Sequence, residues 1–226
     1  RCEAADLNGD GNPDLALVSK GSTSLLVHIG KGDGHFEPEP VVFGPTGDTP
    51  VFLIVRDLDR DGFIDVISAD QLSSTLTIFW GKPGERFLES ATTLSGFGSA
   101  KSMAVGDLDG DGAPDLFLPR SDRPEVQVYL QPGRSIPSKP SLLIPTQEKL
   151  TLLAAADFDA DGIPDLAGVD PIGGNLLIVL LDAQGKVRGQ QSLAAGISPS
   201  AVEVGSIDPG RVPDVAVPCK GSNHVA

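Results

Sequence analysis

The sequence has few aromatic residues, few basic residues and no long apolar run. Phe, Trp and Tyr make up 5% of the 226 residues, with one Trp and one Tyr. The longest apolar run, residues 176–181, is far shorter than the roughly 20 residues of a membrane-spanning helix. With 17 Lys and Arg against 31 Asp and Glu, the formal net charge of -14 argues against a basic surface for nucleic acid or anionic lipid. We therefore expect no nucleic-acid partner and no membrane insertion.

Turn-forming residues are abundant, and enough apolar residues remain to build a core. The chain is 40% hydrophobic, and its 27 Gly and 19 Pro make up about a fifth of it without a collagen period. These residues are expected in turns, since Gly and Pro interrupt helices. Many tight turns predict many short strands.

One acidic string occurs four times. The copies begin at Asp6, Asp57, Asp107 and Asp157, so the starts are 51, 50 and 50 residues apart. A fifth copy, between 205 and 214, lacks the first and third acids, and we interpret it as one residue shorter. The sequence therefore predicts one repeat domain over 1–226 rather than two unlike domains. Its repeats are expected at 1–50, 51–100, 101–150 and 151–199, with a partial, degenerate copy at 200–226.

Each period contains short apolar segments rich in β-branched residues, which predict strands. Four antiparallel strands in a period of about 50 residues are typical of a β-propeller blade, whereas a β-solenoid, the alternative, generally uses shorter repeats. We therefore predict an all-β fold, a β-propeller built of four-stranded antiparallel blades. The expected strands are 52–55, 66–69, 76–80 and 87–92 in the second period and 102–106, 116–119, 126–130 and 142–144 in the third.

The acidic string has the spacing of a calcium-binding loop. Acids at positions 1, 3, 5 and 9, with Gly at position 6 for the sharp turn, place hard oxygen ligands around one point, and the carbonyl of position 7 can add another. Magnesium would require a tighter octahedron, and zinc would prefer His and Cys, but His28, His35 and His224 belong to no cluster. An EF-hand would need Glu at position 12 and flanking helices, and no copy has that Glu.

The alternative interpretation is that these strings are only solvated acidic turns. Fifteen of the 31 acids lie in the four copies, and so many neighbouring carboxylates repel one another unless a cation lies among them. Four calcium ions would add eight positive charges and change the formal net charge from -14 to -6. The sequence therefore predicts about four bound calcium ions.

The acidic string between two strands, with Phe-Gly entering the period at Phe43-Gly44 and Phe97-Gly98, resembles the FG-GAP or VCBS repeat. This is the calcium-binding blade of integrin alpha-subunit propellers and of many secreted bacterial proteins. The resemblance implies that each loop joins the first two strands of a blade and that its ion stabilises this hairpin. It implies no ion in the fifth copy, where Ser206 stands first. The metal positions that it implies are Asp6, Asn8, Asp10, Asn12 and Asp14; Asp57, Asp59, Asp61, Phe63 and Asp65; Asp107, Asp109, Asp111, Ala113 and Asp115; and Asp157, Asp159, Asp161, Ile163 and Asp165, the residue at position 7 binding through its carbonyl.

No combination of residues in the sequence indicates catalysis. It has no nucleophile elbow and no phosphate-binding glycine loop, and the acid pairs that could serve a glycosidase are assigned to calcium. We therefore expect a non-catalytic structural or adhesive protein, extracellular or on the cell surface, where millimolar calcium fills sites of modest affinity. Its expected partners are other protein chains, copies of itself included. The alternative is a ligand- or glycan-recognition module of a longer secreted protein, but Trp80 and Tyr129 are expected to pack between blades rather than stack on sugars.

The two ends of the chain raise two further expectations. Cys2 and Cys219 flank corresponding loops, so they form a disulfide if the ends of the array meet, within a ring or between subunits, and are otherwise free thiols. The fifth copy supplies only two strands and the start of a third, which predicts that the chain alone does not close a regular propeller. Either it is part of a longer propeller, or a neighbouring copy completes it, as in a fibre.

Overall fold

In the computed structural model the chain forms strands, turns and loops, and the described residues contain no helix. Accordingly, no helix in this part of the chain is long and apolar enough to cross a membrane. The described residues form two compact units, Arg1–Lys101 and Ser102–Ala226. The structure describes residues 1–84, 87–89, 91–95, 101–120, 122–130, 134, 136–207, 210, 212–221 and 224–225.

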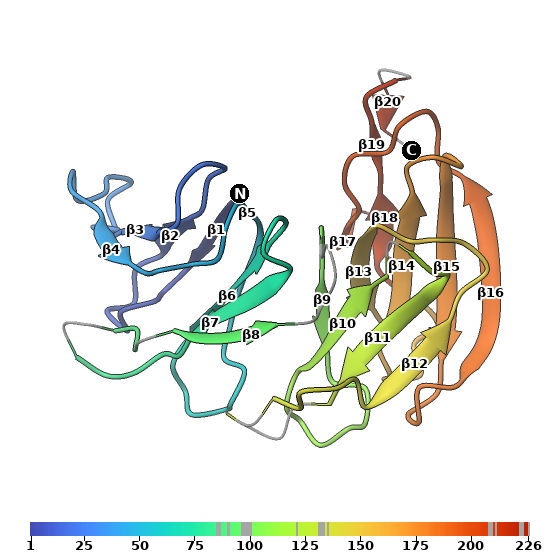
Figure 1. Ribbon diagram of the computed structural model, residues 1–226, viewed down its shortest axis with the longest axis horizontal. Coiled ribbons are helices and arrows are strands. Elements are labelled where there is room, and N and C mark those ends of the chain that lie inside the picture. The colour runs from blue at the N-terminus through green and yellow to red at the C-terminus, as the bar shows by residue number, and fades with distance from the viewer. Residues whose placement is uncertain are drawn as a thin grey trace. The chain divides into compact units, whose positions relative to one another are not determined.

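The first unit consists of two four-stranded antiparallel sheets, each with its strands in sequence order (Figure 1). Consecutive strands pair because short turns connect them, the arrangement of a propeller blade. The first sheet contains β1 (Cys2–Ala5), β2 (Asp14–Leu17), β3 (Leu25–His28) and β4 (Val41–Phe43), and the second contains β5 (Pro50–Arg56), β6 (Asp65–Asp70), β7 (Thr75–Phe79) and β8 (Thr92–Ser95).

The second unit contains two further blades of the same kind and two short hairpins. The four-stranded blades confirm the predicted fold class. The third blade contains β9 (Ala104–Gly106), β10 (Asp115–Pro119), β11 (Glu125–Tyr129) and β12 (Leu142–Pro145), the fourth contains β13 (Leu152–Ala156), β14 (Asp165–Asp170), β15 (Asn175–Leu181) and β16 (Val187–Ala194), and the hairpins pair β17 (Glu203–Gly205) with β18 (Asp214–Ala216) and β19 (Pro218–Cys219) with β20 (His224–Val225).

One predicted strand was wrong. The fourth strand of the second blade was expected at 87–92, but β8 begins at Thr92. Phe87 and Leu88 look like strand residues because they are apolar, yet each is only 3% exposed and packs into the core of the first unit. Leu88 forms only an isolated bridge with Gly81. Burial of the connection, rather than strand pairing, explains these two apolar residues.

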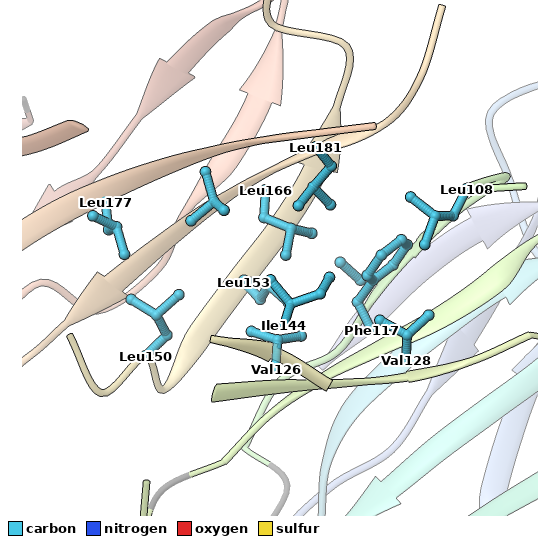
Figure 2. Close-up of a cluster of buried hydrophobic side chains, with 12 residues drawn as sticks. Leu108, Phe117, Val126, Val128, Ile144, Leu150, Leu153, Leu166, Leu177 and Leu181 are labelled. Carbon is cyan, nitrogen blue, oxygen red and sulfur yellow. The ribbon is translucent and has the colours of Figure 1, made fainter. Parts of the chain in front are cut away.

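The core of each unit lies between neighbouring blades. In the first unit Phe43 and Phe87 contribute an edge-to-face ring pair with centroids 5.2 Å apart. In the second unit Phe117 and Val128 of the third blade pack with Leu166 and Leu181 of the fourth (Figure 2). A blade without its neighbour would expose this apolar face, so the repeats stabilise one another.

The single Trp and the single Tyr belong to this buried framework. Trp80 and Tyr129 are 4% and 2% exposed, and the Trp80 indole N–H donates to Thr92 Oγ1 at 3.1 Å. Neither ring offers a face on which a sugar could stack. Both cysteines are free thiols, Cys2 exposed and Cys219 buried with its Sγ 3.2 Å from the Ala195 carbonyl oxygen. The intrachain disulfide considered above is therefore not formed in the structure.

Candidate metal sites

Each of the four acidic loops joins the first two strands of its blade. The loops begin directly after β1, β5, β9 and β13, and position 9 is the first residue of the next strand in every case. Position 2 is Leu7, Leu58 or Leu108 in the first three loops, each at most 2% exposed. The apolar residue at position 2 therefore fixes one side of these loops in the core.

The backbone turns twice through the left-handed region in every loop. Position 6 is Gly with φ between 86° and 88° in all four copies. Position 4 also has positive φ, and there two copies have Gly9 and Gly110, while the others have Arg60 and Ala160, both at 62°. The sequence indicated the turn at position 6 through the Gly that all four copies have there. It did not indicate the turn at position 4, because two of the copies lack Gly at that position.

The first acid of each loop is held by the backbone that curls around it. Its Oδ2 accepts the N–H of position 6 in all four copies, at 2.8 Å from Gly11, 3.0 Å from Gly62, 2.9 Å from Gly112 and 2.8 Å from Gly162. A glycine N–H can turn inward at this point because the left-handed conformation is open to it. The resulting closure orients the carboxylate before any ion is bound.

The fifth position is held in the same way. The carboxylate there accepts the N–H of position 7 at distances from 2.7 to 2.9 Å in all four loops. The residues predicted to bind through their carbonyls, Asn12, Phe63, Ala113 and Ile163, are therefore the N–H donors of this bond. Their role as carbonyl ligands remains a prediction.

The ninth position has a structural role that the sequence did not indicate. Asp65 is fully buried, its Oδ2 accepts the N–H of Leu58 at 2.7 Å, and its Oδ1 accepts the N–H of Gly81 at 2.6 Å. It therefore ties its loop to the end of the third strand of the blade. Asp14 makes the equivalent pair of bonds to Leu7 and Gly30, Asp165 makes it to Phe158 and Leu181, and Asp115 accepts from Leu108.

Burial changes the acidity of these ninth-position carboxyls. It raises the pKa of Asp65 from 3.8 to about 6, although the N–H groups of Gly81 and Leu58 oppose the increase. Burial raises the pKa of Asp14 and Asp165 as well. A charged group out of water is stabilised by a nearby cation, so these carboxylates favour a bound positive ion.

Three of the loops bring carboxylate oxygens together as a metal site requires. In each, three acids offer one oxygen apiece, all within 4.8 Å of one another. Asp57 Oδ1 and Asp159 Oδ1 are also buried and have no hydrogen-bond partner among the described residues. Such oxygens fit a hard cation such as calcium. The groups are Asp57, Asp59 and Asp61; Asp107, Asp109 and Asp115; and Asp157, Asp159 and Asp165, so Asp65, Asp111 and Asp161 lie outside them.

The first loop differs because Asn8 replaces the second acid. The Asn8 Nδ2 group donates to Asp10 Oδ2 at 3.0 Å, and the Asn12 N–H holds the pKa of Asp10 below its ordinary value. All nine residues of this loop are described, and no three of its carboxylates meet as in the other loops. Its predicted ligands Asp6 and Asp14 remain in the equivalent positions, so it offers a weaker donor set.

The fifth copy keeps one part of the loop and lacks the rest. The N–H of Ile207 donates to Asp214 Oδ2 at 2.8 Å, the same seven-residue connection as in the intact loops. The copy is therefore not one residue shorter, and that interpretation was wrong. It has Ser206 at position 1 and Gly210 at position 5, while Ile207 at position 2 is 78% exposed rather than buried. Of the two Phe-Gly pairs, Phe97-Gly98 lies outside the described residues.

Comparison with known proteins places the chain in a family. The model of the FG-GAP-like repeat matches residues 6–68 and 57–118, which together span half of the chain. The protein therefore belongs to the FG-GAP-like repeat family. No curated protein matches it. Among solved structures, the crystal structure of BBS1N in complex with ARL6DN, soaked with lead, aligns with 96% of this chain and 74% of that chain, at 11% identity and a TM-score of 0.49.

Proposed function

We propose that this chain is a non-catalytic, calcium-stabilised propeller module that acts outside the cell as a structural or adhesive element. One observation carries the calcium part of the proposal: three loops each bring three carboxylate oxygens within 4.8 Å, and two of these loops contain a buried oxygen without a partner in the described part of the chain. Oxygen-only donors at this spacing favour calcium over zinc.

The ligands that we propose are the acids at positions 1, 3, 5 and 9 of each loop, Asn8 in place of an acid, and the carbonyl of position 7. The hydrogen bonds to positions 1 and 5 support this assignment, since they orient the carboxylates in the same way in every copy. Calcium would supply the positive charge that keeps the carboxylates together and would join the two strands on either side. At free calcium a hundred times the dissociation constant, one site contributes about 2.7 kcal/mol of stability.

Calcium titration calorimetry of the wild-type chain and two variants tests this proposal. We expect four ions for the wild type and three for Asp111→Ala, which removes one fifth-position carboxylate. Asp33→Ala removes an exposed acid from the β3–β4 connection of another blade and should leave four ions. Heat of binding equal to buffer for the wild type, or an unchanged stoichiometry for Asp111→Ala, would contradict the calcium assignment.

The proposed location follows from the calcium sites. Calcium is millimolar outside cells, where sites of even modest affinity are filled, and each filled loop stabilises a blade hairpin. Protein partners are part of the proposal, and two apolar residues at equivalent turns support it. Leu72 in the β6–β7 turn and Ile172 in the β14–β15 turn are 69% and 98% exposed. Protein contact, including contact between copies, would cover them.

Sedimentation at micromolar concentration with calcium tests the self-associating form of this role. Association that weakens in a double variant, Leu72→Ser with Ile172→Ser, is the expected result. A compact monomer of 23.4 kDa in both proteins would contradict self-association. Sugar binding on a glycan array would instead favour the recognition module, although the buried Trp80 and Tyr129 do not offer a stacking surface for it.

A further inference from the structure

The fourth loop contains a cation supplied by the chain itself. Arg188 lies on β16, and its Nη1 is 3.0 Å from Asp159 Oδ2 and also forms an ion pair with Asp161 Oδ2. These are two of the four carboxylates of the loop. A guanidinium therefore lies where the positive charge of an ion would be needed.

Arg188 reaches the loop because the β15–β16 ladder is irregular at this residue. Leu180 pairs with Gly189 and Leu181 pairs with Val187, so Arg188 is an extra residue opposite no partner, a β-bulge. A bulge turns the side chain of the inserted residue away from its regular direction. The β13–β14 and β15–β16 connections lie at the same end of this antiparallel sheet, so the bulge is next to the acidic loop.

The first two blades shift register at the corresponding place as well, since Ile78 pairs with Thr92 but Gly81 with Leu88, and Val27 pairs with Val41 but Gly30 with Phe36. In the second blade, Gly81 pairs with Leu88, and the next residue, Glu89, donates its N–H to the Trp80 carbonyl at 2.8 Å. The first blade repeats this pattern at its Gly30–Phe36 bridge, followed by a bond from Glu37. The residue after the bridge is acidic in these two blades and is Arg188 in the fourth, so the basic side chain, not the register shift, distinguishes the fourth blade.

We propose that Arg188 is an intramolecular counter-ion that competes with calcium for the fourth loop. The inference rests on the proposed calcium function and concerns the regulation of one of its sites. Calcium and the guanidinium both require oxygens of Asp159 and Asp161, so calcium binding there must displace Arg188. The Arg188 side chain is 45% exposed and can move into water, which makes displacement possible. The fourth site is then weaker than it would be without Arg188, and its carboxylates stay neutralised when calcium is scarce.

Calcium titration of Arg188→Gln tests the competition. We expect one site to bind calcium about 1.5- to fivefold more tightly than in the wild type, the range that the energy of an exposed ion pair allows. Arg123→Gln removes the same charge from the β10–β11 turn of the third blade and should leave every affinity unchanged. In an Asp161→Ala background the fourth loop should have lost its ion, as the third does in Asp111→Ala, so Arg188→Gln should no longer tighten any site.

A second measurement uses the calcium-free protein. Without calcium, Arg188→Gln should lower the denaturant midpoint, because the fourth loop loses its counter-ion, and saturating calcium should abolish or reverse that difference. Four sites with affinities unchanged by Arg188→Gln would overturn this inference and leave the proposed calcium function intact. No calcium binding by either protein would overturn both.

Discussion

Replacing Asp65 by Ala should destabilise the first unit whether or not calcium is present, whereas Asp61→Ala should act mainly through calcium. Asp65 is fully buried and accepts two backbone N–H groups, from Leu58 and Gly81. Its removal leaves both groups buried without an acceptor, at about 1–3 kcal/mol each. The variant also no longer has to bury a carboxylate, which offsets part of this cost. We therefore expect the free energy of unfolding to fall by about 2–3 kcal/mol. Asp61 is exposed and accepts the N–H of Phe63, a bond worth about 1 kcal/mol.

The single tryptophan makes this comparison specific to the affected blade. Trp80 is 4% exposed, and its neighbour Gly81 is one of the two N–H donors to Asp65. Urea unfolding followed by Trp80 fluorescence therefore reports the first unit. With a slope of about 2 kcal/mol/M, Asp65→Ala should shift the midpoint by about 1–1.5 M in chelator, and by more in calcium because Asp65 is also a proposed ligand.

The two variants should differ most clearly in chelator. There, Asp61→Ala should shift the midpoint by about 0.5 M or less on the same slope. In calcium at a hundred times the dissociation constant, the Asp61→Ala variant should also lose the stabilisation by its ion, about 2.7 kcal/mol of the free energy of unfolding. Equal losses for the two variants in chelator would refute the structural role that we assign to Asp65.

Two further predictions concern the same loops. In calcium-free protein, carbon NMR should show the Asp65 carboxyl titrating near pH 6. Because its pKa in the folded state lies above the ordinary 3.8, the contribution of this carboxyl to the free energy of unfolding should fall as the pH rises from about 4 to 6. Calcium should move that midpoint downward by favouring the carboxylate, and a midpoint near 4 without calcium would contradict the burial argument. Ala160→Gly should stabilise the fourth loop by about 0.5 kcal/mol, because Ala160 has a φ of 62° that costs a non-glycine residue about 1 kcal/mol. Gly110→Ala is the reverse change at position 4 of the third loop, and it should lower the free energy of unfolding by about 1 kcal/mol in a denaturant titration. An increase would refute the conformational argument.

The blades could be predicted from the sequence because their period is visible in it. Acids, glycines and apolar segments recur every 50 or 51 residues, and each feature is local to its strand or turn. The tie between Asp65 and Gly81 could not be predicted in this way. Its donor is a backbone N–H sixteen residues away, and the equivalent donor in the fourth blade belongs to Leu181, so no side-chain pattern marks the position.

Arg188 was missed for a related reason. Its contact with the loop depends on one inserted residue in β16, and a register shift of one residue is not visible in a repeat whose strands vary in length. The fourth strand of the second blade was misplaced for the converse reason. Phe87 and Leu88 have the composition of a strand, but their burial, not their pairing, accounts for it. Local composition therefore identified the loops and most strands, while register decided which residues meet.

The fifth copy separates the two roles that the intact loops combine. Asp214 accepts the N–H of Ile207 at 2.8 Å, within the 2.7 to 3.1 Å of the equivalent bonds in the four intact loops, although Ser206 and Gly210 stand where carboxylates would otherwise be. Closure of the hairpin by the ninth residue therefore does not depend on the acids at positions 1 and 5. Those acids, in contrast, are oriented by N–H groups that turn inward only in a closed loop. Under the proposed calcium function, each ion would bind to a hairpin that is already formed, so it should add its own increment of stability without deciding whether its blade folds.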